Sequence, residues 1–111
     1  MLNLTRTIMH DGSRCFLSLR PQADWYAVRD HVSRLAGAEL TGFLTDEITE
    51  AWIDFSYSGY EFNINDAPGD YWFFVGDAEC PDATLRIVAT HFAELLEPER
   101  LDAPLPPDNS L

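Results

Sequence analysis

The chain has 111 residues, the length of one folded domain and too short for a multi-domain enzyme. Hydrophobic residues make up 46% and charged residues 23%, a balance typical of a globular protein and not of a disordered one. Nineteen acidic residues against seven basic ones give a net charge of -12. This excess of acid argues against binding to nucleic acid or to an anionic membrane surface, because both require clustered positive charge.

The charge is unevenly distributed along the chain. All seven basic residues are arginine, and five of them lie in residues 1–34 against three aspartates, a net of +2. Residues 35–85 contain no arginine and eleven acidic residues, a net of -11. If those acids point outward, the middle of the chain forms a surface of one sign.

The compartment follows from the absence of targeting signals and from cysteine usage. The sequence begins without the apolar run of a signal peptide, and no stretch approaches the roughly 20 apolar residues of a membrane span. The two cysteines, Cys15 and Cys80, have no metal-ligand spacing. We therefore expect a cytoplasmic protein with two reduced thiols, and the sequence leaves open whether they meet in space.

The first elements in chain order are two strands and a helix. Strands are predicted over residues 3–9 and 14–20, joined by Asp11-Gly12, a signal for a type I′ hairpin. A helix is predicted from near Pro21 to just before Gly37. Its apolar stripe consists of Trp25, Val28, Val32 and Leu35.

A strand over residues 39–45, with a turn at Asp46-Glu47, leads to the strongest local signal. Residues 51–57 and 60–66 alternate apolar and polar side chains around the two-residue loop Ser58-Gly59. This loop sets a register with one apolar face and one largely polar face. The apolar pairs are Tyr57–Tyr60, Phe55–Phe62 and Ile53–Ile64, and the polar pairs are Ser56–Glu61, Asp54–Asn63 and Trp52–Asn65.

The next strand, residues 70–76, is apolar on both faces, so its orientation depends on the preceding loop. A four-residue loop places Trp72 and Phe74 on the polar face, beside Asn63 and Glu61. A five-residue loop places Tyr71 and Phe73 there instead. In either case the polar face gains large aromatic rings.

A second helix is predicted from Pro81 to just before Pro98, with an apolar stripe of Leu85, Val88, Phe92 and Leu95. The single domain spans residues 1–97, and the proline-rich residues 98–111 are expected to form an extended, mobile tail. The element order ββαββββα predicts an α+β fold. We expect a two-layer sandwich in which two helices pack on one face of a mainly antiparallel sheet.

The polar face of this sheet is the candidate binding site. Aromatic rings among short polar side chains provide contact area at little cost in entropy, which is typical of recognition surfaces. The alternatives are an ordinary solvated face, or a face covered by a second copy in a homodimer or by the N-terminal hairpin. The candidate residues are Trp52, Asp54, Ser56, Glu61, Asn63, Asn65, Trp72 and Phe74.

Signals for catalysis or metal binding are weaker. Asp54 and Glu61 share a face without being directly opposite, which disfavours them as an acid–base pair. Residues 65–70 carry oxygen ligands but fit a hairpin turn better than a calcium loop. Cys80 precedes a helix start, where the dipole lowers a thiol pKa, yet no motif ties a histidine to it. We expect no cofactor and no metal site.

These observations favour a non-enzymatic protein-interaction module, similar in size and charge to acidic inhibitors and chaperones, that engages a basic protein partner. Complementary charge would speed the encounter and reject wrong partners. The alternative is a small-molecule-binding domain or small enzyme with Trp52, Asp54 and Asn63 as a pocket floor. A deep cavity above these residues would favour the alternative, and a flat acidic patch would favour the interaction module.

Overall fold

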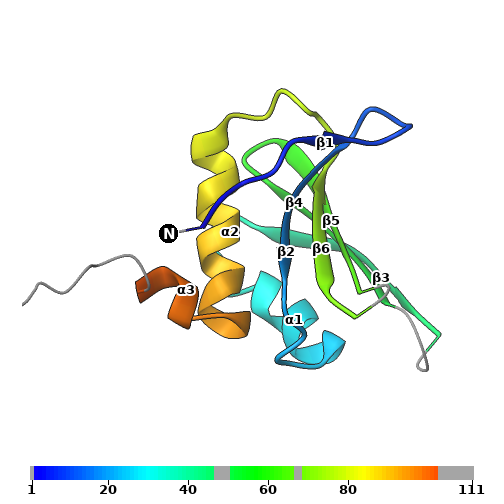
Figure 1. The fold of residues 1–111 in the computed structure, drawn as a ribbon. Helices are drawn as coiled ribbons and strands as arrows, with labels where there is room; N and C mark the ends of the chain where they lie inside the picture. The colour runs from blue at the N-terminus through cyan, green and yellow to red at the C-terminus, as the bar shows by residue number, and fades with distance from the viewer. Residues whose placement is uncertain (1, 47–50, 67–68, 103–111) are drawn as a thin grey trace, which may run out of the picture.

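One antiparallel sheet with helices on one side forms the framework of the molecule (Figure 1). The structure is a computed structural model that describes residues 2–46, 51–66 and 69–102. Six strands lie in the order β1-β2-β6-β5-β4-β3, which confirms the predicted α+β fold. The elements are β1 (Thr7–Ile8), β2 (Arg14–Leu19), α1 (Trp25–Val32), β3 (Glu39–Thr45), β4 (Ala51–Tyr57), β5 (Tyr60–Asn65), β6 (Tyr71–Val75), α2 (Asp82–Leu96) and α3 (Glu99–Asp102).

The β4–β5 hairpin has the predicted register. Ser58 and Gly59 have φ angles of 54° and 84°, and a two-residue type I′ loop requires positive values at both positions. The cross-strand pairs run as predicted from Tyr57–Tyr60 at the loop to Trp52–Asn65. β3 pairs with β4 over the predicted residues, and the turn expected after it at Asp46-Glu47 extends beyond the described residues.

β6 presents the same side chains to each face as predicted for the four-residue loop, but its register against β5 is shifted by two residues from that prediction. Trp72 lies opposite Asn65 and Phe74 opposite Asn63, whereas the expected neighbours were Asn63 and Glu61. The turn between β5 and β6 is therefore longer than the predicted four residues. At its start the Asp66 carboxylate accepts a hydrogen bond from the Ala51 amide at 2.8 Å, which ties Asp66 to β4. Trp72 and Phe74 therefore share the polar face, and the alternative with Tyr71 and Phe73 is excluded.

The N-terminal hairpin differs from the prediction in its loop and its length. Its loop has three residues, closed by a hydrogen bond from the Met9 amide to the Ser13 carbonyl at 2.8 Å. Gly12 has a φ of 89°, and Asp11 is not in the left-handed region, so the type I′ prediction is wrong. β1 is only Thr7–Ile8. Before it, the Thr5 amide still donates to the Phe16 carbonyl at 2.9 Å, and Leu2 is buried in the core.

α1 is shorter than predicted at both ends. It begins after Asp24, whose carboxylate caps the helix by accepting from the Ala27 amide at 2.8 Å, so Pro21 remains in the preceding loop. After Val32 the chain continues in hydrogen-bonded turns to Gly37, where φ is 90°. The α1 stripe still packs inward, with Val28 and Val32 fully buried.

α2 covers the apolar face of the sheet much as predicted. Pro81 precedes its first turn, and Leu85, Val88 and Phe92 are buried. At the last turn Leu96 is buried, while Leu95 is only partly buried. The Phe92 ring lies 5.6 Å from the Phe55 ring and 5.3 Å from the Phe73 ring, which joins helix and sheet in one aromatic core. No helix among the described residues has both the length and the apolarity needed to cross a membrane.

Helical structure continues past Glu97, where the sequence predicted the end of the domain. Residues Glu99–Asp102 form α3, where an extended segment was expected, and Leu101 packs against the core. The buried Glu97 carboxylate accepts from the Arg20 amide at 2.7 Å and lies 3.4 Å from the Arg100 guanidinium. These contacts fix α3 beside the end of β2. The rest of the expected tail, residues 103–111, lies outside the described residues.

Candidate functional site

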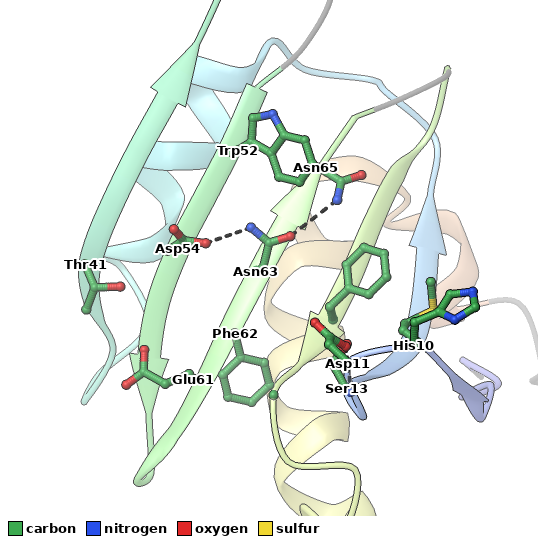
Figure 2. Close-up of a pocket in the computed structure, with 13 residues that line it drawn as sticks. His10, Asp11, Ser13, Thr41, Trp52, Asp54, Glu61, Phe62, Asn63 and Asn65 are labelled. Atoms are coloured by element: carbon green, nitrogen blue, oxygen red, sulfur yellow. Dashed lines mark hydrogen bonds between the residues drawn. The ribbon is translucent and has the colours of Figure 1, made fainter.

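A groove lies on the outer face of the sheet, opposite the helices (Figure 2). We call it the outer-face groove. Its volume is about 720 Å³, within the range of roughly 300–1,000 Å³ common for ligand sites. The groove is open to solvent and broad, so it is neither the deep cavity nor the flat patch that the two sequence-based alternatives required.

The floor of the groove comes from three neighbouring strands. Because side chains alternate along a strand, every second residue of β4, β5 and β6 points to this face. Six of the eight candidate residues line the groove, and Ser56 and Trp72 lie on the same face outside its lining. The six are Trp52, Asp54, Glu61, Asn63, Asn65 and Phe74.

A chain of hydrogen bonds fixes the polar part of the floor. Asn65 Nδ2 donates to Asn63 Oδ1 at 3.3 Å, and Asn63 Nδ2 donates to Asp54 Oδ1 at 2.7 Å, as Figure 2 shows. Gly42 lies opposite Asp54 on β3, and a Cβ added there would be 3.1 Å from Asp54 Oδ2. The carboxylate is therefore held on one side by an amide and has space on the other only because position 42 lacks a side chain.

The tip of the N-terminal hairpin forms one wall of the groove. The sequence offered this hairpin as one alternative cover of the polar face, but it did not identify the residues that line the wall. Met9, His10, Asp11 and Ser13 line it. They reach the groove because β2 pairs with β6. Hydrogen bonds from the Ser13 hydroxyl and amide hold the pKa of Asp11 below its ordinary value and keep it a carboxylate.

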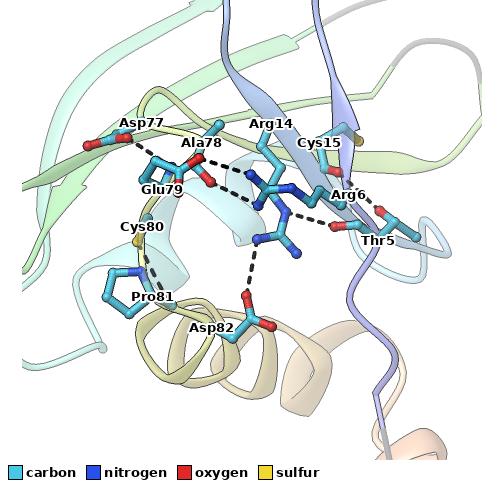
Figure 3. A network of polar contacts seen from close by, with 10 residues as sticks. All are labelled: Thr5, Arg6, Arg14, Cys15, Asp77, Ala78, Glu79, Cys80, Pro81 and Asp82. Atoms are coloured by element: carbon cyan, nitrogen blue, oxygen red, sulfur yellow. Dashed lines mark hydrogen bonds and ion pairs between the residues drawn. The ribbon is translucent and has the colours of Figure 1, made fainter.

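Two arginines fasten this hairpin to the segment that leads into α2 (Figure 3). The buried Arg14 side chain donates from Nε to the Thr5 carbonyl at 2.9 Å and from Nη1 to Asp82 Oδ1 at 3.1 Å. Arg6, which is exposed, donates to the Ala78 carbonyl at 3.1 Å and pairs with Glu79 at 3.0 Å. The wall is thus anchored to the helix layer as well as to β6.

The groove is acidic. Its lining contains the carboxylates of Asp11, Asp54 and Glu61, and among the described lining residues there is no arginine. Most arginines make contacts elsewhere within the chain. Ion pairs or carbonyl contacts engage Arg6, Arg14, Arg20, Arg29, Arg86 and Arg100.

The other candidates from the sequence lie apart from the groove or serve structural roles. Asp54 faces Asn63 and Glu61 faces Ser56, so the two carboxylates do not oppose each other. In the turn over residues 65–70, of which 67–68 are outside the described residues, Asp66 binds the Ala51 amide. The described residues contain no group of three or more acids, histidines or cysteines placed to hold a metal ion.

Both cysteines are buried free thiols. Cys15 lies opposite Phe74, whose side chain is on the outer face, whereas Cys80 belongs to the core beneath α2. Burial raises the pKa of Cys80, and the nearby Asp77 raises it further, which is opposite to the helix-dipole effect considered from the sequence. Cys80 is therefore a thiol at neutral pH, and the reactive-cysteine interpretation loses its basis.

His31 and His91 form a contact that the sequence did not predict. Their rings stack with centroids 3.9 Å apart, and each Nε2 donates to the backbone carbonyl of the other residue, at 2.8 and 2.7 Å. The pair joins α1 to α2 on the far side of the sheet from the groove. Burial lowers the pKa of His31, so its ring is neutral at pH 7.

No protein-family model, curated protein or solved structure matches the chain. Its function is therefore inferred from the outer-face groove itself.

Proposed function

We propose that this protein is a non-enzymatic binding module whose outer-face groove holds a positively charged segment of a protein partner. The observation that carries the proposal is the composition of the lining: three carboxylates, and among the described lining residues one histidine, His10, but no arginine. Opposite charge speeds association and discriminates against acidic competitors.

The groove also offers apolar contact for the stem of a long basic side chain. Trp52 is 42% exposed, and Phe74 is partly exposed beside Asn63. A guanidinium or ammonium over an indole face gains about 0.5–1 kcal/mol at an exposed site, more when it is desolvated. The hydrogen-bonded floor is ordered before binding, which lowers the entropy lost on association.

A separate partner fits better than a second copy of the chain. A homodimer held by opposite charges would need arginines of the N-terminal third of one copy, Arg6, Arg14 or Arg20, to meet the acids of the other copy. All three pair with acids of their own chain: Glu79, Asp82, and Glu97 with Glu99. Two copies that each carry a net charge of -12 also repel one another. We place this binding in the cytoplasm, where both free thiols would stay reduced.

The groove volume favours a second candidate, a small cationic molecule. About 720 Å³ can hold a ligand of drug-like size, and Trp52, Asp54 and Asn63 lie in its floor. This is the small-molecule alternative from the sequence, with its ligand restricted to cations by the lining charge. A small enzyme acting on such a molecule would use the same floor.

Calorimetric titration with three probes tests the proposal. Hexa-arginine should bind at micromolar concentration and weaken as salt is raised from 50 to 300 mM, because the interaction is electrostatic. Hexa-glutamate should not bind. Agmatine, which presents a single guanidinium, should bind far more weakly than the peptide, and equal affinity for agmatine would support the second candidate. No binding of hexa-arginine at millimolar concentration would overturn the proposal.

A further inference from the structure

The edge of the sheet beside the groove is open. β3 is the outermost strand on this side, and within the described ranges no strand pairs with its other edge. Over its seven residues β3 contains neither proline nor lysine, the residues that commonly protect an edge strand from pairing. A strand edge without such protection can act as a template on which another strand adds.

The exposed side chains of β3 continue the apolar surface of the groove. Leu44 is 68% exposed and lies opposite Trp52 on the outer face. Thr41, at the β-bulge between Leu40 and Gly42, lines the groove directly (Figure 2). The open edge and the outer-face groove therefore form one surface.

Gly42 leaves a passage from the edge to the groove floor. It lies directly opposite Asp54, and its missing side chain is what leaves space beside that carboxylate. Neighbouring strands are about 4.8 Å apart, so a strand added to β3 would lie roughly 10 Å from β4. A long basic side chain of the added strand can cross above Gly42 and reach Asp54, which a shorter side chain could not.

We propose that the partner binds as an extended strand added to the edge of β3, and that its basic side chains cross above Gly42 into the outer-face groove. Main-chain hydrogen bonds to β3 supply affinity, and alternate side chains supply specificity. This inference rests on the proposed function, since it takes the same cationic partner and adds how that partner is held.

Charge selects the occupant of the edge. Glu39 on β3, Asp54 on the adjacent β4 and Glu61 on β5, one strand further in, favour a basic strand. Symmetric pairing of two β3 strands would bring these acidic surfaces together. Residues 103–111 of the chain itself carry one aspartate and no basic residue, so their sequence gives no charge complement.

The test uses a capped octapeptide of four Arg-Val repeats and the same peptide methylated at every backbone amide. The two probes share side chains and charge, but the methylated probe has no N–H donor for a strand ladder. By calorimetry the plain peptide should bind at least tenfold more tightly. Hydrogen exchange should show that saturating plain peptide protects β3 amides that exchange quickly in the free protein.

Protein variants provide a second readout. Leu44→Gln and Gly42→Val should each weaken binding of the plain peptide at least fivefold. Ile87→Gln is the matched control for Leu44→Gln, because Ile87 is a 48% exposed apolar residue on α2 and its replacement should change nothing. Asp54→Asn should weaken binding of both peptides, since both carry the same charge.

The outcomes separate the two proposals. Equal binding of both peptides, with no protection of β3 amides, would overturn strand addition, and the proposed function would stand if Asp54→Asn still weakened both. If Asp54→Asn had no effect on either peptide, the proposed function itself would fail. A wild-type dimer that Leu44→Gln converts to a monomer would overturn the inference by identifying a second copy as the occupant.

Discussion

Asn63 has the central position in the groove floor, because it accepts from Asn65 and donates to Asp54. Asn63→Asp removes the amide group that donates to Asp54 Oδ1 at 2.7 Å and places a second carboxylate directly opposite that of Asp54. Like charges at such a position and the lost hydrogen bond should together cost about 1 kcal/mol of stability. Urea denaturation measures this loss, which should shrink in 1 M salt.

Asn65→Asp is the matched control for that substitution. It also removes a donor from the amide chain, but the residue opposite it is Trp52 and not a carboxylate. Its loss of stability should therefore be smaller and less sensitive to salt. Equal losses for the two variants would show that the Asp54–Asn63 contact has no special importance.

Substitutions of Phe62 and Trp52 compare the buried and the exposed face of the β4–β5 hairpin. Phe62 is 3% exposed, and its ring stacks on Phe55 with centroids 5.1 Å apart. Phe62→Ala should cost about 3–5 kcal/mol, as is usual for a buried aromatic ring. Trp52→Ala should cost less than about 1 kcal/mol in the same denaturant melts, because Trp52 is half exposed. A small loss for Phe62→Ala would show that the apolar face is not the core.

At the scale of elements, the two ion pairs that anchor the N-terminal hairpin are expected to contribute different amounts to the stability of the protein. Arg14→Met leaves the Thr5 carbonyl and Asp82 without their buried partner and should destabilise the protein by about 1–3 kcal/mol. Arg6→Met breaks an exposed pair with Glu79 and should cost less than about 1 kcal/mol. Thermal denaturation compares them, and a larger loss for Arg6→Met would contradict this account of the anchor.

The His31–His91 pair should make the α1–α2 contact sensitive to pH. The folded pKa of His31 lies below its ordinary value of 6.5, so the unfolded chain binds more protons as the pH falls through that range. Stability contributed by the neutral ring is complete above pH 6.5 and is lost at lower pH. Of the charged and titratable groups near His31, His91 and Arg34 lower its pKa and Glu94 raises it.

Urea denaturation at pH 7.5, 6.5 and 5.5 measures this dependence. The free energy of unfolding should fall across the series, and the fall should be shallower in His31→Gln, whose side chain can donate a hydrogen bond without titrating. A wild-type slope in His31→Gln would rule out His31 as the titrating group.

Most strands and both long helices were predictable from the sequence, although the N-terminal hairpin loop, the ends of α1 and all of α3 were not. Contacts between distant elements were not predictable. Ser58-Gly59 and the flanking alternation determine the β4–β5 register, because a two-residue loop permits only one pairing. The wall at Met9 and His10 depends on β2 pairing with β6, more than fifty residues away in the chain, and no local pattern encodes that choice. The stacked histidines likewise require two helices to meet at one point.

At the scale of the whole molecule, the outer-face groove was only partly predictable, because its shape also depends on contacts between distant elements. Alternation on β4 and β5 placed Trp52, Asp54, Asn63 and Asn65 on one face. That face is concave because the tip of the N-terminal hairpin closes one side of it. The charge asymmetry along the chain is also resolved only in the fold. Arginines of the N-terminal third pair with acids from residues 77–99, and the acids of β4 and β5 remain on the open face.

The most direct test of the central claim, that the outer-face groove binds a cation, is the affinity of hexa-arginine for two variants of equal charge. Asp54→Asn with Glu61→Gln removes two charges from the groove, and Asp30→Asn with Glu94→Gln removes two from the helix layer. Calorimetry at 50 mM salt should show at least tenfold weaker binding to the groove variant and a change of less than twofold for the helix variant. Equal weakening of the two would mean that the peptide responds only to net charge, which would contradict the account.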